Sequence, residues 1–261
     1  MYIMKVHILG SLSGTEPFPN RHHTAWVLEL DNGHLYWFDA GENCSHTAYL
    51  KGLDFFNIKA LFISHPHSDH LEGLLNIFHI YRKMQYLEND LATSRTIQMF
   101  FPVENLWNIY RDLLNATGGC PPNLQLPDHL LSDGGCFEND EIKVEFLANT
   151  HIPVAPGEKL KSFSFRITAQ DKVIVYSGDV GSAAEISDWS RQCDLILMES
   201  GHHHPWEVCA QWHADNCQIN QIVFMHHGRD VLYWPTECKI RCRRAWGKEV
   251  IFAEDGMSFE L

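Results

Sequence analysis

Three histidines and one aspartate occur within six positions of this sequence, directly after an apolar segment at residues 59–63. Imidazole and carboxylate groups are common ligands of zinc and of neighbouring metals. In a tight loop, His65 and His67 can reach one metal ion, while Asp69 and His70 can reach a second ion close by. The apolar segment predicts a buried strand, and the end of that strand would hold the loop in place.

The same kinds of side chain recur where other predicted strands end. His151, Asp179 and His226 each follow such a strand. The three strands are predicted at residues 141–147, 172–176 and 221–225. Loops at the ends of strands assemble binding sites in layered α/β proteins. A lone histidine after a strand is usually a hydrogen-bonded surface residue, but four such loops in one chain favour a shared metal centre.

Strands and helices alternate along the chain, which is typical of an α/β protein. Further strands are predicted at residues 2–9, 24–30, 34–38, 96–101, 162–168 and 195–198. Helices are predicted at residues 45–53, 71–87, 103–114, 182–190 and 206–217. The turn Asp-Asn-Gly at residues 31–33 predicts a hairpin. Residues 115–139 are rich in Gly and Pro and predict a loop with at most a short strand.

The composition narrows the class of protein. The chain has 261 residues, of which 45% are hydrophobic, enough for one large core or two closely packed halves. No apolar run approaches the roughly 20 residues that span a membrane, and no signal-peptide pattern is present. We therefore expect a cytoplasmic protein that contacts no membrane. The net charge of −13 argues against a surface that generally coats nucleic acid, although metal ions can create a local anion site.

The eight cysteines contain no C-x-x-C pair. Reduced structural thiols are therefore favoured over disulfides. Cys238 and Cys242 are four residues apart, one helical turn, and could contribute to a zinc site. Four basic residues between positions 239 and 244 form either a solvated helix face or a phosphate contact.

At these residues the chain resembles the metallo-β-lactamase-fold superfamily of hydrolases. The H-x-H-x-D-H motif spans residues 65–70, and the later His, Asp and His of the pattern match His151, Asp179 and His226. The resemblance covers nearly the whole length. It implies an α/β fold, a four-layer αββα sandwich, in a single domain over residues 1–261 with an apolar insertion around residues 76–140.

The resemblance also implies two divalent metal ions, with zinc preferred and manganese, iron or nickel as alternatives. The first ion would be held by His65, His67 and His151, the second by Asp69, His70 and His226, and Asp179 would bridge the two. Two such ions activate water and bind oxygens of the reacting group. His226 is preferred to His227 because successive side chains of a strand point to opposite faces.

Asp39 lies in the segment Phe-Asp-Ala-Gly-Glu at the end of a predicted strand. It resembles a family aspartate that braces the metal-bearing loop. The resemblance implies that Asp39 binds no metal but accepts hydrogen bonds from that loop and so orients the ligands.

A finer resemblance is to the branch that contains ribonuclease Z and the cyclic phosphodiesterases. The glycine-rich opening at residues 9–17 and the following Arg21 are similar to that branch. There a glutamate holds a catalytic histidine, and Glu199 and His204 match these two positions. His204 would stabilise the transition state or protonate the leaving oxygen. Because histidines also occupy residues 202–203, it stays open which of these histidines matches the catalytic one.

One departure bears on the substrate. Bacterial ribonuclease Z carries a long basic arm that grips tRNA, whereas only 27 residues separate His151 from Asp179 here. We expect a phosphodiesterase that acts on a small or cyclic nucleotide or on an RNA end, with Asp69 orienting the attacking hydroxide. The alternatives are a hydrolase of a carboxylic ester, lactone, lactam or thioester, and a non-hydrolytic regulatory or redox module. Nucleic acid and a second copy of the chain stay open as partners.

Overall fold

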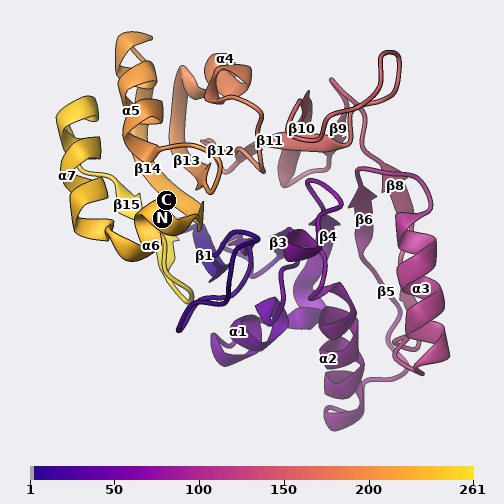
Figure 1. Cartoon of the computed structure of the whole chain (residues 1–261). Helices are drawn as coiled ribbons and strands as arrows, with labels where there is room; N and C mark the ends of the chain where they lie inside the picture. Colours follow the sequence, from indigo (N-terminus) through magenta and orange to yellow (C-terminus); the bar gives the residue numbers. More distant parts are fainter. Residues whose placement is uncertain (1–2) are drawn as a thin grey trace. The chain divides into compact units, whose positions relative to one another are not determined.

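The structure is a computed structural model that describes residues 3–261 (Figure 1). These residues form two compact units. Unit 1 comprises residues 3–10, 22–131 and 255–260, and unit 2 comprises residues 11–21, 132–254 and 261. The single domain over residues 1–261 stays a prediction, and the first residue of the predicted strand 2–9 lies outside the described part. Within residues 3–261, no helix is both long and apolar enough to cross a membrane.

Unit 1 is built on a seven-stranded mixed sheet with the order β16-β1-β2-β3-β4-β6-β8. Its strands are β1 (Lys5–Gly10), β2 (Ala25–Glu29), β3 (Leu35–Phe38), β4 (Ile58–Phe62), β6 (Gln98–Phe101), β8 (Asp128–Leu130) and β16 (Ser258–Glu260). β2 and β3 pair antiparallel, which confirms the predicted hairpin. β3, β4, β6 and β8 run parallel. The carboxyl ends of β3 and β4 therefore lie side by side.

Helices cover one face of this sheet, and aromatic rings line the other. The helical elements are α1 (Cys44–Leu50), η1 (Phe55–Asn57), η2 (Ser68–His70), α2 (Leu74–Leu87) and α3 (Leu106–Ala116). Buried side chains of the helices and the sheet, among them Phe78 and Trp107, form one core. On the opposite face the rings of Trp26, Phe38 and Phe62 stack across neighbouring strands, with centroids 4.3 and 4.9 Å apart.

Two segments of unit 1 differ from the sequence expectation. The helix predicted from residue 71 begins at Leu74, because the chain first makes the turn η2 and then passes Gly73. A Cβ at Gly73 would lie 2.2 Å from the carbonyl oxygen of Gly41, so this turn requires glycine. The predicted loop at residues 115–139 contains short strands, including β7 (Leu124–Gln125), which pairs with β5 (Arg95–Thr96).

The second sheet forms the frame of unit 2 and has the order β15-β14-β13-β12-β11-β10-β9. Its strands are β9 (Cys136–Glu138), β10 (Ile142–Asn149), β11 (Ser162–Ala169), β12 (Lys172–Tyr176), β13 (Gln192–Ser200), β14 (Gln218–His227) and β15 (Ile251–Phe252). Strands β9 to β12 pair antiparallel, and β12 to β15 pair parallel. The carboxyl ends of β12, β13 and β14 therefore share one edge, as the strand-end pattern predicted.

The helices of unit 2 pack on this sheet through a second core that includes Ile196, Trp212 and Phe224. They are η3 (Ala183–Ile186), α4 (Ser187–Ser190), α5 (Pro205–Ala214), α6 (Arg229–Tyr233) and α7 (Pro235–Trp246). Proline opens α5 and α7, where its missing N–H costs nothing. Gly247 ends α7 at a φ of 83°.

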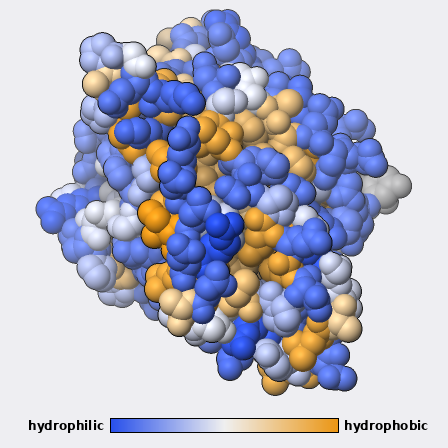
Figure 2. Space-filling view, turned by 90° about the vertical axis from the view of Figure 1, so that its right-hand side faces the viewer, coloured by the Kyte–Doolittle hydropathy of each residue, from blue (hydrophilic) through white to orange (hydrophobic). Residues whose placement is uncertain are grey.

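The surface carries both hydrophilic and apolar side chains. Figure 2 shows apolar side chains scattered among hydrophilic ones on the side of the molecule that carries α3. On α3 itself, Ile109 and Leu113 are 65% and 45% exposed. Single apolar residues of this kind are normal on protein surfaces and by themselves indicate no partner.

Candidate functional site

Unit 1 carries the loop from Ser64 to His70 directly after β4. Asp39, at the end of β3, braces this loop through both of its carboxylate oxygens. The Ser64 backbone N–H donates to Oδ1 at 2.7 Å, and the Ser64 hydroxyl donates to Oδ2 at 2.8 Å. His70 Nδ1 donates to Oδ2 at 2.8 Å. Asp39, Ser64 and His70 are all fully buried, so these hydrogen bonds are shielded from water.

These hydrogen bonds fix which ring nitrogens carry protons. A carboxylate can only accept, so His70 carries its proton on Nδ1 and directs the Nε2 lone pair away from Asp39. The Ser64 hydroxyl donates its single proton to Asp39. It can therefore only accept from His65 Nδ1, which lies 3.0 Å away and must carry a proton. His65 Nε2 then faces His67 Nδ1 at 3.1 Å. Two lone pairs at that distance repel unless a proton or a cation lies between them.

Asp69 completes the loop. Its Oδ2 lies 3.5 Å from His70 Nε2, and its side chain is largely buried. The structure thus brings together the four residues that the H-x-H-x-D-H spacing predicted. Their donors, imidazole nitrogen and carboxylate oxygen, fit a divalent transition metal in their chemistry.

Unit 1 contains a second cluster that the sequence reasoning missed. Glu42 Oε2 lies 2.5 Å from His23 Nδ1 and also accepts the His23 backbone N–H at 3.0 Å. Burial opposes protonation of His23, but the contact with Glu42 outweighs it and raises the pKa of the imidazole. Glu72 lies in the same cluster. Its three members lie in three separate segments, so no motif connects them in the sequence.

In unit 2, the carboxylate of Asp179 is surrounded by imidazoles. Its Oδ2 lies 3.3 Å from His226 Nε2, 3.6 Å from His151 Nε2 and 3.7 Å from His202 Nδ1. Asp179 and His226 are 1% exposed. The sheet produces this arrangement, because Asp179 follows β12, His226 lies at the end of β14 and His151 follows β10.

Glu199 lies behind the histidines, near the end of β13. Its Oε1 is 3.3 Å from both His202 Nδ1 and His203 Nε2, and its Oε2 accepts the backbone N–H groups of Gly201 and His202 at 2.9 Å each. Burial opposes its ionisation, but the hydrogen bonds and charge of His202 and His226 outweigh this and hold the pKa of the carboxyl below its usual range. The hydrogen bond to Glu199 in turn raises the pKa of His202 against the effect of its own burial.

The expected contact between Glu199 and His204 needs correction. His204 Nδ1 lies 2.6 Å from Asp230 Oδ2, and its ring stacks on Trp206. The reason is local: the chain turns sharply at residues 201–203, and His204 then precedes Pro205 in an extended conformation as α5 begins. Of the histidines at residues 202–204, His202 is the one beside both Glu199 and Asp179, and His226 also lies near both carboxylates.

The two other neighbouring histidines have structural partners. His203 Nε2 donates to the carbonyl of Val180 at 2.9 Å. His227 Nε2 donates to the carbonyl of Ala253 at 2.9 Å, while its Nδ1 accepts from the Ser200 hydroxyl at 2.9 Å. Burial lowers the pKa of His227 to about 3, so this ring is neutral. His226 faces Asp179 instead. It has a φ of 51° and lies at an irregularity in the pairing of β13 with β14, so the extended geometry assumed for the strand does not persist there.

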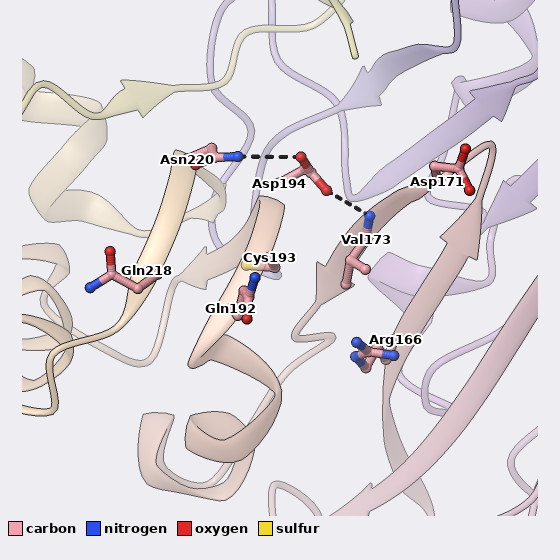
Figure 3. A pocket seen from close by; sticks show the side chains of 8 residues that line it. All are labelled: Arg166, Asp171, Val173, Gln192, Cys193, Asp194, Gln218 and Asn220. Carbon is pink, nitrogen blue, oxygen red and sulfur yellow. Dashed lines mark hydrogen bonds between the residues drawn. The ribbon is translucent and has the colours of Figure 1, made fainter.

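Unit 2 also contains a cavity of about 390 Å³ away from these residues (Figure 3). It lies near the amino ends of β13 and β14, at the opposite strand ends from Asp179. In Figure 3, Asp194 accepts from Asn220 Nδ2 at 3.2 Å and from the backbone N–H of Val173 at 2.9 Å. These bonds tie neighbouring strands together, and none of the predicted site residues lines the cavity.

Comparison with known proteins identifies a family and several relatives. A family model described as "Anti-Pycsar protein Apyc1" matches residues 4–229. Ribonuclease Z of Shouchella clausii (strain KSM-K16) is 28% identical over 175 residues, which are 65% of this chain and 49% of that protein. The chain thus spans about half the length of this relative.

Solved structures share the fold. The metallo-β-lactamase-fold protein YhfI from Bacillus subtilis superposes with a TM-score of 0.75 at 16% identity, over 99% of this chain and 100% of that one. The short form of human tRNase Z superposes with a TM-score of 0.72 at 19% identity, over 98% of both chains.

These matches confirm the α/β fold class, the four-layer αββα sandwich of the metallo-β-lactamase fold. They also confirm the resemblance to the ribonuclease Z branch of that superfamily. The family model covers most of the chain, from the first strand to the start of α6. The chain belongs to the family of the anti-Pycsar protein Apyc1.

Proposed function

We propose that this chain is a metal-dependent phosphodiesterase that acts on a small or cyclic nucleotide or on an RNA end. The observation that carries the proposal is the buried carboxylate of Asp179 with three imidazoles around it, one of which, His202, is held by the buried Glu199. The ribonuclease Z relatives support the hydrolase class.

The proposal includes two divalent metal ions, with zinc preferred to manganese, iron or nickel. The proposed ligands are His65, His67 and His151 for the first ion and Asp69, His70 and His226 for the second, with Asp179 shared. The chemistry of the donors supports this, because imidazole nitrogens and carboxylate oxygens suit these metals. Two ions of this kind supply Lewis acidity to phosphoryl oxygens and acidify water.

The protein's own groups would then divide the remaining work. His202 would carry a proton to the departing oxygen, since its ring lies beside Asp179 at the centre of the proposed site. Glu199 would orient that ring through the contact at 3.3 Å. Asp69 would orient the attacking water. The proposal gives the proton-carrying role to His202 and not to His204, because His202 lies beside Asp179 and Glu199, whereas His204 lies beside Asp230.

The geometry of unit 2 also bears on substrate size. Between His151 and Asp179, strands β11 and β12 take up about half of the chain, and residues 152–161 are the longest stretch outside them. That stretch is too short for a long arm that could grip a folded RNA. Substrates of small size, or an RNA end alone, therefore fit the proposal best.

A substrate panel tests the reaction class. Metal content of the purified protein would be measured first, and hydrolysis would then be assayed with bis(p-nitrophenyl) phosphate, 2′,3′-cyclic nucleotides, nitrocefin and a lactone. We expect turnover of the phosphodiesters alone. Faster hydrolysis of nitrocefin or of the lactone would assign the chain to carboxylic esters or amides instead. Absence of bound metal together with absence of turnover would favour a non-hydrolytic module.

A pair of matched variants tests the general acid. His202→Ala should retain both metals and lose about 10²–10⁴-fold in rate on a substrate with an alkoxide leaving group. The loss should be smaller with p-nitrophenolate, which leaves without protonation. His204→Ala, two residues away, is the control and should keep near-normal rates on both substrates. A larger loss in His204→Ala than in His202→Ala would exclude the proposed role.

A further inference from the structure

Helix α7 and the turn after it carry an unusual concentration of positive charge. Five basic and no acidic residues lie between positions 239 and 248, although the chain as a whole has a net charge of −13. All five are exposed. They are Lys239, Arg241, Arg243, Arg244 and Lys248, and together they form what we call the α7 basic surface.

Interactions within the protein account for only part of this charge. Arg243 pairs with Glu249 at 2.7 Å, and the helix dipole favours Arg243 and Arg244 in the last turn. Neither Lys239 nor Arg244 has an ion-pair partner within residues 3–261. Lys239 and Arg243 are four residues apart, and like charges at that spacing destabilise a helix by roughly 0.2–0.5 kcal/mol. An external anion would relieve this repulsion.

Aromatic rings border the basic surface. The ring of Trp206 has His204 stacked on it, with centroids 4.6 Å apart, and the Arg241 guanidinium lies 3.3 Å from its centroid. Just before α7, Tyr233 and Trp234 are 51% and 58% exposed. Large exposed rings beside cations provide flat platforms for stacking.

The contacts of Trp206 with His204 and Arg241 also connect the basic surface with the proposed active site. His202 lies beside Asp179, and His204, two residues later, begins the series of contacts that leads through Trp206 to Arg241 on α7. All of these residues belong to unit 2. A strand bound along α7 could therefore reach His202 with its end.

We propose that the α7 basic surface, together with Tyr233 and Trp234, binds single-stranded RNA whose end enters the proposed phosphodiesterase site. The combination fits this partner because cations contact phosphates while aromatic rings stack with unpaired bases. The inference rests on the proposed function for the reaction, and among the proposed substrates it selects the RNA end.

The test measures RNA binding separately from catalysis. The triple variant Lys239→Glu, Arg243→Glu, Arg244→Glu would be compared with the parent protein by fluorescence anisotropy of a labelled 12-nucleotide single strand. We expect binding at least about tenfold weaker, with the slope of log K against log salt reduced by about 2, since each lost phosphate contact accounts for roughly 0.7. Trp234→Ala should weaken binding roughly fivefold or more. Hydrolysis of bis(p-nitrophenyl) phosphate should be unchanged in all of these variants.

The control variant makes the same change in charge elsewhere, through Lys83→Glu, Arg111→Glu and Lys159→Glu, all at exposed positions. Equal loss of RNA binding in both triple variants would overturn the inference, since net charge alone would explain it. Unchanged RNA binding in the α7 variant, with loss of binding to phosphatidylserine vesicles, would also overturn it. If α7 substitution abolishes RNA binding but the parent hydrolyses no phosphodiester, the docking surface stands and the proposed function fails.

Discussion

The two units present their metal-ligand candidates in contrasting ways. Unit 1 gathers His65, His67, Asp69 and His70 in one loop between β4 and α2. Unit 2 supplies single residues from separate strand ends, between position 151 and position 226. In the first unit one tight turn sets the spacing, and in the second the parallel strands of a sheet set it.

The difference extends to what holds the ligands. The loop of unit 1 depends on one buried carboxylate, Asp39, which accepts three hydrogen bonds from Ser64 and His70. In unit 2 the central carboxylate, Asp179, itself lies next to the imidazoles. Substitution at the centre of unit 2 should therefore remove a ligand, whereas substitution of the brace in unit 1 should only loosen one.

The largest effect is expected from Asp179→Ala. Because one carboxylate oxygen lies within 3.7 Å of three imidazoles, its removal should empty at least one metal position and leave phosphodiester hydrolysis undetectable. The loss of metal affinity should exceed the roughly 10–100-fold expected of a residue that only orients a ligand. Metal content by mass spectrometry would measure it, with the exposed Asp188→Ala as control. If Asp179→Ala kept both metal positions fully occupied, Asp179 would not be a metal ligand, and the expected difference between the two units would be wrong.

A smaller effect is expected from Asp39→Asn. The amide keeps an oxygen for Ser64 but presents an N–H₂ group where His70 donates, so the His70 ring loses its fixed orientation. We expect metal affinity, measured by competition with a chelator, to fall by roughly 10–100-fold. Asp54→Asn, a carboxylate that caps η1 in the same unit, is the control. Unchanged affinity would mean that Asp39 supports the backbone alone.

The smallest effect concerns pH and His227. Its pKa is about 3 in the fold and about 6.5 in an unfolded chain, because burial disfavours the charged ring. Between these values only the unfolded chain takes up the proton, so the free energy of unfolding is highest above pH 6.5 and falls as the pH drops. From pH 7 to pH 5.5 the loss should be about 1 kcal/mol.

Urea unfolding of the metal-free protein would measure this loss, with His227→Gln as the comparison. The variant lacks the titrating group, so its stability should decline less over the same pH range. Parallel declines in both proteins would show that His227 is accessible to protons in the folded state. The contrast with His226, its neighbour beside Asp179, would then disappear.

Sequence reasoning succeeded where a local rule determines the structure. The loop after β4 follows from spacing, but strand alternation does not account for the direction of His226, because sequence reasoning foresaw no bulge at the end of β14. Sequence reasoning chose the wrong histidine at residues 202–204. The turn after Gly201 has no periodicity, and three identical side chains in a row do not show which one contacts Glu199. Sequence reasoning also missed the contact of His23 with Glu42, which joins two segments that no motif connects in the sequence.

The stacked rings of unit 1 give the molecule an internal spectroscopic reporter. The indole of Trp26 lies 4.3 Å from the parallel ring of Phe38, in a row that continues through Phe62 to Phe100 and His129. Rigidly held rings of this kind produce near-ultraviolet circular dichroism and displace the magnetic resonances of protons above them. Because the row belongs to unit 1, the resonances that its rings displace report on the folding of that unit without any added label.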